Sequence, residues 1–212
     1  MRAYMKSAMP YLGVPSPGLR EACRLVFSTH SLDSFDDWQD TVLALWRGAR
    51  FREERYASVL LTGERRYRDY QTLDALPLYE ELIVTGAWWD FVDAIANKRI
   101  GGLLKRYPAR MGRTMRAWSR SRDMWKRRTA ILCQLSFKSD TDLTLLYDCI
   151  EPNLDDKEFF IRKAIGWALR QHAWTDAKEV QRYVARNRTR LSGLSAREAL
   201  KNVEEGTRRQ MC

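Results

Sequence analysis

The stretch KEFFIRKAIGWALR, residues 157–170, places apolar residues at the spacing of an α-helix. One stripe of this helix is uniformly apolar and should be buried; it consists of Ile161, Ala164, Ile165, Ala168 and Leu169. The adjacent stripe is mixed and consists of Phe160, Lys163, Trp167 and Arg170. Trp167 suits a core and a surface groove equally well. Gly166 inside a helix costs about 1 kcal/mol relative to Ala, so it indicates close packing or the close approach of a ligand.

The rest of the chain follows the same period, and no segment sustains the period of two that is typical of a strand. The pattern predicts helices over residues 17–27, 35–48, 51–63, 75–84, 87–96, 99–107, 110–119, 122–137, 141–150, 157–172, 176–187 and 195–205. Three serines carry N-cap signatures: Ser16 before Pro17, Ser34 three residues before Asp37, and Ser195 three residues before Glu198.

Short helices with short connections, arriving in pairs of about 35–40 residues, are typical of an α-solenoid of the HEAT or armadillo kind. An irregular all-α bundle is the alternative. We expect a single HEAT-like repeat domain over residues 1–212, with a tail after about residue 205 that is mobile.

Positive charge is concentrated in residues 98–128, which hold twelve Lys or Arg and one acid, Asp123. The other residues carry 25 basic and 26 acidic side chains, so the net charge of +10 is a local feature. We call residues 98–128 the basic band. Its arginines recur every three or four positions, as on one face of a helix, and include Arg113 and Arg116. Such a band indicates a polyanionic partner, of which nucleic acid is the first candidate.

The numbers and spacing of cysteine and histidine, together with the hydropathy of the chain, limit which classes of protein the sequence fits. The four cysteines lack a CxxC spacing and there are two histidines, His30 and His172, which we interpret as structural. We therefore expect free thiols, no metal and no cofactor. No apolar run approaches the roughly 20 residues of a membrane span, and the first residues do not resemble a signal peptide. The sequence predicts a cytoplasmic protein, nucleoid-associated when bound to DNA, with no membrane partner.

Two further segments carry candidate site residues. In AWWDFVDAIA, residues 87–96, Trp88, Phe91, Val92 and Ile95 share an apolar side, whereas Trp89 and Asp93 share the neighbouring face. Either Trp89 belongs to the core and Asp93 is a solvated or salt-bridged acid, or the two form a site. In MWKRRTAIL, residues 124–132, the apolar residues should turn inward and the basic ones outward. There Arg128 could clamp a phosphate with two hydrogen bonds, or belong to a solvated helix edge.

The segments WWDFVD, MWKRRTAILCQL and KEFFIRKAIGWALRQ together resemble the DNA alkylation repair family of HEAT-like alkylpurine DNA glycosylases, the AlkD type. YMKSAMPYLGVPSPGLR near the start and LSGLSAREALKN near the end resemble the same family, so the likeness covers nearly the whole chain. It implies a right-handed α-α superhelix of HEAT-like repeats with a concave basic groove for duplex DNA. Family members carry a further helix before the YMK-like segment, so we expect this chain to lack the usual first helix.

The resemblance also implies an activity and its residues. The activity is hydrolysis of the N-glycosidic bond of cationic alkylated purines such as 3-alkyladenine and 7-alkylguanine, by a monomer acting on duplex DNA. Asp93 matches the catalytic carboxylate, Trp89 and Trp167 match two groove tryptophans, and Arg128 and Tyr4 match DNA-contacting residues. Further DNA contacts are expected from basic residues of the helices that hold Arg128 and Trp167 and of the helix predicted over 110–119, namely Lys126, Arg127, Lys163, Arg170, Arg113 and Arg116.

Three alternatives remain open from the sequence. A non-catalytic DNA-binding HEAT-like protein, for damage sensing or architecture, would share the basic band. A HEAT-like scaffold for proteins would present a mixed or apolar surface rather than such a band. A protein that binds structured RNA would need a competition experiment to be distinguished from a DNA-binding one.

Overall fold

The computed structural model describes residues 2–210, and the side chains of residues 4–201 and Val203. All regular secondary structure in residues 2–210 is helical, with no strand. Most helices follow the predicted ranges to within two residues, but the helix predicted over 122–137 ends at Leu132 and the one predicted over 195–205 spans Gly193–Gln210. The all-α fold class is confirmed. Contacts divide the chain into two compact units, Met1–Ile95 and Ala96–Cys212, and each is described by itself.

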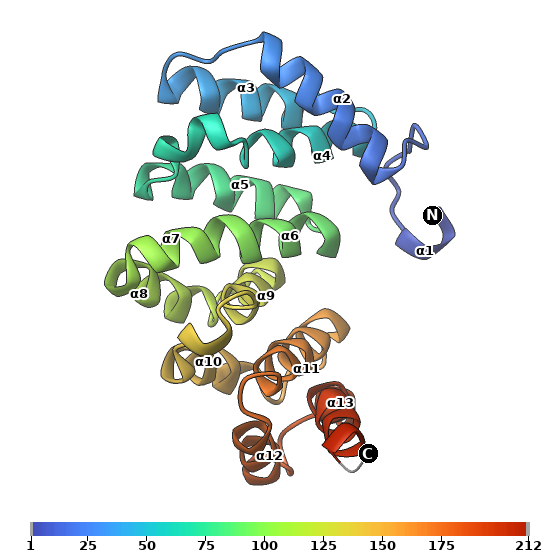
Figure 1. The fold of residues 1–212 in the computed structure, drawn as a ribbon, viewed down its shortest axis with the longest axis vertical. Helices are drawn as coiled ribbons and strands as arrows, with labels where there is room; N and C mark the ends of the chain where they lie inside the picture. The colour runs from blue at the N-terminus through green and yellow to red at the C-terminus, as the bar shows by residue number, and fades with distance from the viewer. Residues whose placement is uncertain (1, 211–212) are drawn as a thin grey trace. The chain divides into compact units, whose positions relative to one another are not determined.

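The first unit is built around α4. Its helices are α1 (Arg2–Met5), α2 (Ser16–Thr29), α3 (Phe35–Arg47), α4 (Arg52–Leu61), α5 (Leu76–Gly86) and α6 (Trp89–Ile95), with 3₁₀ turns η1 (Arg65–Tyr70) and η2 (Leu73–Ala75) (Figure 1). Helix α4 packs on α2, α3 and α6, and α5 packs on α3 and α6. Trp46 of α3 lies at the centre: its ring meets Phe91 of α6 at 5.3 Å, and its indole N–H donates to Thr85 Oγ1 at 2.8 Å.

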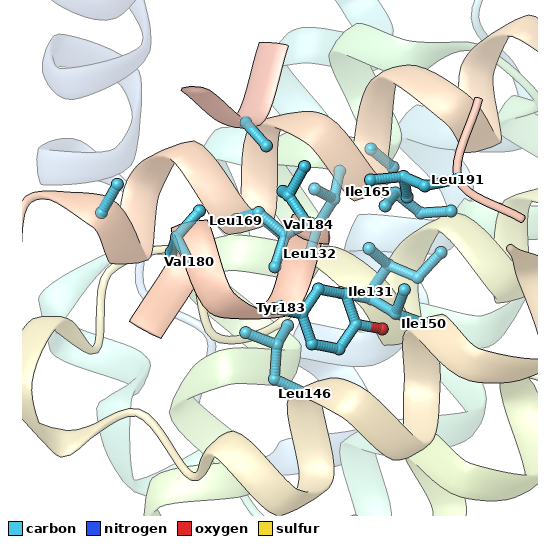
Figure 2. Close-up of a cluster of buried hydrophobic side chains, with 14 of the residues drawn as sticks. Ile131, Leu132, Leu146, Ile150, Ile165, Leu169, Val180, Tyr183, Val184 and Leu191 are labelled. Atoms are coloured by element: carbon cyan, nitrogen blue, oxygen red, sulfur yellow. The ribbon is translucent and has the colours of Figure 1, made fainter. Parts of the chain in front are cut away.

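The second unit is centred on α11. It comprises a π-helical turn η3 (Ala96–Ile100), α7 (Gly101–Arg106), α8 (Pro108–Trp118), α9 (Met124–Leu132), η4 (Lys138–Asp140), α10 (Leu143–Ile150), η5 (Glu151–Asn153), α11 (Phe159–Ala173), α12 (Ala177–Arg186) and α13 (Gly193–Gln210). The predicted stripe of α11, from Ile161 to Leu169, is buried against α9, α12 and α13. Figure 2 shows this core, to which Ile131 and Leu132 of α9, Ile165 of α11 and Val180 of α12 all belong.

Within each unit, helices that are neighbours in sequence pack on one another. The pairs are α3 with α4, α5 with α6, α7 with α8, α8 with α9, α11 with α12, and α12 with α13. This is the helical-repeat arrangement that the rhythm of the sequence predicts, and it disfavours an irregular bundle.

Gly166 is explained by packing between helices. A Cβ at this position would lie 2.5 Å from Glu198 Cβ and 2.9 Å from the Ser195 carbonyl oxygen, both on α13. The glycine therefore allows α11 and α13 to approach closely, and of the two readings of its sequence the structure supports packing.

Two of the three predicted N-caps are wrong. Ser34 does cap α3, accepting the Asp37 N–H at 3.0 Å. By contrast, Ser16 is the first residue of α2, and the N-cap is Pro15. Pro17 therefore lies at the second helical position and not at the first. Ser195 lies inside α13 and is buried; its hydroxyl donates to the Arg162 carbonyl, and its N–H is accepted by Ser192 Oγ at 3.0 Å. Glu198 binds two cations of α11 instead of closing a capping box.

Candidate nucleic-acid-binding and catalytic site

The junction of α5 and α6 orients Trp89 and Asp93. Helix α5 ends because Ala87 adopts a left-handed conformation, φ 41°, with its N–H bonded to the Ile83 carbonyl. The Trp88 carbonyl then accepts the Val92 N–H at 3.1 Å, and α6 begins. Phe91, Val92 and Ile95 are buried, as the spacing predicts. Trp89 and Asp93, four residues apart, are both partly exposed.

Tyr4 lies beside Trp89. The two rings meet edge to face, with centroids 6.2 Å apart and planes at 90°. Tyr4 is 76% exposed, so its ring extends the surface that Trp89 begins. The first unit thus brings together two of the predicted aromatic residues with the helix that carries Asp93. We call these two rings the Tyr4–Trp89 pair.

Asp90, in the same segment, belongs to a network with α4. Its carboxylate accepts from the Arg52 guanidinium at 2.5 Å and from the Tyr56 hydroxyl. Burial of Tyr56, together with its bond to Asp90, raises the pKa of that phenol well above its usual range. The network is structural. It was missed from the sequence because the cluster REER, residues 52–55, has the composition of a solvated helix start, whereas Arg52 and Glu53 are almost fully buried.

Arg128 does not project outward as predicted. It is 4% exposed, lies over the Phe160 ring, and donates through Nη1 to the Phe160 carbonyl. Its neighbours Lys126 and Arg127 are partly exposed. Arg127 pairs with Asp156 at 3.1 Å and also donates to backbone carbonyls of the preceding loop. The inward turn of Ala130, Ile131 and Leu132 is confirmed.

The mixed stripe of α11 faces α13 in part. Trp167 is partly buried and packs against the apolar core of the second unit. Lys163 and Arg170, one turn below and above it, both bind Glu198 of α13 at 2.8 Å. Hydrogen bonding to Lys163 lowers the pKa of Glu198. The positive charge of this stripe is therefore partly balanced from within the unit.

The arginines of the basic band differ in their exposure. Arg116 of α8 binds Asp148 of α10 at 2.7 Å, whereas Arg113, one turn earlier, is exposed. Arg106 and Arg110 are exposed as well.

The structure also bears on what the sequence predicts for the cysteines, the histidines, metal sites and membrane spans. Cys23, Cys133 and Cys149 are free and buried; Cys212 lies outside the described residues. His172 is buried and His30 is exposed. Among the side chains that the structure describes, those of residues 4–201 and Val203, no group of three or more acidic, histidine or cysteine residues is arranged to bind a metal ion. Within residues 2–210, no helix has the length and hydropathy to cross a membrane.

Comparison with known proteins places these residues in a family. The model of the DNA alkylation repair enzyme family matches residues 1–203. The chain belongs to this family. A solved structure of a predicted DNA alkylation repair enzyme from Enterococcus faecalis has 28% sequence identity, covers 95% of this chain and 92% of its own, and superimposes with a TM-score of 0.83. A search of curated proteins found no match. Membership of the DNA alkylation repair enzyme family supports a role in DNA repair.

Proposed function

We propose that this member of the family is a DNA glycosylase that hydrolyses the N-glycosidic bond of cationic alkylated purines, such as 3-alkyladenine and 7-alkylguanine, in duplex DNA. The observation that carries the proposal is the Tyr4–Trp89 pair, whose Trp89 begins the helix that holds Asp93 one turn later. The pair belongs to a DNA alkylation repair enzyme whose sequence holds a dense basic band.

Hydrolysis of this N-glycosidic bond requires few catalytic groups from the protein. An alkylated purine already carries a positive charge, so it leaves without further protonation, and positive charge develops on the sugar. A fixed carboxylate near that sugar stabilises an oxocarbenium-like transition state and can orient the attacking water. In this proposal Asp93 is that carboxylate. Asp93 is the residue that matches the catalytic carboxylate in the family resemblance, and it lies partly exposed one turn after Trp89.

The aromatic rings supply a second favourable contact. The face of a tryptophan attracts a cation with about 1–2 kcal/mol when the contact is desolvated. We assign Trp89 and Trp167 this role toward the cationic nucleoside. Lys126, Arg127, Lys163 and Arg170 are proposed to contact the DNA backbone, and such contacts fix the position of a duplex on a protein. Arg128, which is 4% exposed, is not part of this proposed set.

Replacing Asp93 by Asn tests the proposal. Release of 7-methylguanine from a methylated duplex should fall by about 100-fold or more, because an amide cannot stabilise a developing cation as a carboxylate does. Duplex affinity, measured by fluorescence anisotropy, should hold or improve, since a negative charge is removed. The matched control is Asp69→Asn, which removes an exposed acid of η1 in the same unit and should leave excision unchanged.

The alternative is a non-catalytic DNA-binding protein that senses damage or shapes DNA. It predicts duplex binding by the wild type without release of any alkylated purine. Performing the assay in EDTA checks the expectation that no metal is needed. Competition between duplex DNA and duplex RNA distinguishes an RNA-binding protein, and the absence of salt-dependent DNA binding would favour a protein scaffold.

A further inference from the structure

Residues 7–14 cross the start of α4 without helical structure and are held there by a buried carboxylate. We call residues 7–14 the arm. Glu53, 3% exposed, accepts the backbone N–H groups of Leu12, Gly13 and Val14 at 3.0, 2.9 and 3.2 Å. Gly13 adopts φ +87°, which aligns consecutive N–H groups on one acceptor. A buried charge is tolerated only when it is hydrogen-bonded in this way.

Arg52, the preceding residue, binds the arm at two more points. Its backbone N–H donates to the Pro10 carbonyl at 2.9 Å, and its Nη1 donates to Ser7 Oγ at 2.7 Å. The guanidinium is 2% exposed and lies 4.2 Å from the Phe91 ring centroid. Residues 52 and 53 together therefore hold the arm along its length.

The same guanidinium reaches α6. Nη2 of Arg52 binds the carboxylate of Asp90, the residue that follows Trp89. One planar fork thus joins Ser7, three residues after Tyr4, to the first turn of the helix that begins with Trp89. Arginine suits this task because its donors point in fixed directions.

The electrostatics favour a charged Glu53. Burial alone would raise its pKa, but the backbone N–H groups of the arm lower it below the usual range. At neutral pH the carboxylate is ionised and binds all three arm amides at full strength. This matters because α1 has four residues, too few for a helix to be stable by itself. The arm is the covalent connection through which α1 is held.

We propose that Arg52 and Glu53 are positioning residues, which anchor the arm and thereby keep Tyr4 against Trp89. The inference deepens the proposed function, on which its catalytic part rests: the anchored Tyr4–Trp89 pair is the form that receives the alkylated nucleoside. Neither Arg52 nor Glu53 contacts the substrate.

The anchoring is tested first without any substrate. Glu53→Gln should raise amide hydrogen exchange in the arm at least tenfold, measured by mass spectrometry on peptides covering residues 7–14. The matched control is Glu54→Gln. Glu54 is the next residue of α4 and also accepts backbone N–H groups, but those of Arg50 and Phe51. A milder variant, Ser7→Ala, removes the side-chain oxygen that accepts from Arg52 and from the Met9 N–H within the arm, and it replaces no apolar core residue. Unchanged exchange of the arm in both Glu53→Gln and Ser7→Ala would overturn the proposal.

The catalytic part is tested by a double-mutant cycle with Tyr4. Excision of 7-methylguanine by Glu53→Gln should fall to the level of Tyr4→Ala, and the double variant should be no worse than either. A general loss of stability would instead give multiplicative losses, and this result, or wild-type excision by Glu53→Gln, overturns the positioning role. If the wild type releases no alkylated purine, the proposed function fails, and exchange of the arm still decides whether it is anchored.

Discussion

At the scale of single residues, two glycines of the second unit differ in what surrounds them. Gly166 faces α13 with no room for a methyl group, whereas a Cβ on Gly102 of α7 would meet nothing within 4 Å. The same substitution should therefore have opposite effects at the two positions.

Gly166→Ala should lower the free energy of unfolding by about 1–3 kcal/mol, because α11 and α13 must separate to admit the methyl group. Gly102→Ala should raise it by up to about 1 kcal/mol, since alanine favours the helix and packs against nothing. Urea denaturation followed by circular dichroism measures both. Equal effects at the two glycines would contradict the packing explanation.

The sequence predicts the exposure of some site residues correctly and of others incorrectly. The partial exposure of Trp89 and Asp93 agrees with their helical spacing, because spacing determines which face of an element a residue occupies. Spacing could not distinguish Asp90 from Asp93, or predict that Arg128 is buried. The environments of these two side chains depend on partners distant in sequence, Arg52 for Asp90 and Phe160 for Arg128. Helical periodicity carries no information about such partners.

At the scale of elements, the helices of both units were predictable, but two of the three predicted N-cap residues were wrong. Apolar periodicity extends over three or four turns, so it locates a helix such as α11 to within a few residues. An N-cap depends on one side chain, and a serine near a helix start can equally pack inside, as Ser195 does. The arm has no periodicity at all, and its anchoring by α4 could be found only in the structure.

The end of α11 should make stability depend on pH. His172 is buried in its last turn, and neither ring nitrogen has a hydrogen-bond partner among the described residues. Burial lowers its pKa below 6.5, although Asp176 and Glu179 act in the opposite direction. The unfolded chain therefore takes up this proton first as pH falls. The contribution of neutral His172 to the free energy of unfolding is present above about pH 6.5, and it is lost as the pH decreases from there toward the pKa of His172 in the folded protein.

His172→Gln should accordingly reduce the loss of stability between pH 7.5 and pH 5.5, measured as the change in urea midpoint. The control is His30→Gln, which replaces the exposed histidine that follows α2 and should retain the wild-type pH dependence. A wild-type pH profile in His172→Gln would show that this imidazole is not the group responsible.

At the scale of the whole molecule, the charge of the sequence and the charge available to a partner are different quantities. The basic band carries +11 in sequence, yet Arg116 and Arg127 are bound by acids from α10 and from the loop before α11. An arginine already paired releases fewer counterions from DNA when it reaches a phosphate, because its partner competes for it. The exposed arginines of α8 should therefore dominate the salt dependence of binding.

This difference gives a measurable prediction for Arg113 and Arg116. In a plot of log affinity for duplex DNA against log salt concentration, Arg113→Gln should reduce the slope by about 1, the value for one phosphate contact. Arg116→Gln should reduce it less, because Asp148 already neutralises that guanidinium at 2.7 Å. Arg65→Gln, an exposed arginine of η1 outside the band, is the control and should leave the slope as it is. A slope unchanged by Arg113→Gln would mean that α8 does not meet the DNA, and that the positive charge required for binding lies on other helices of the band.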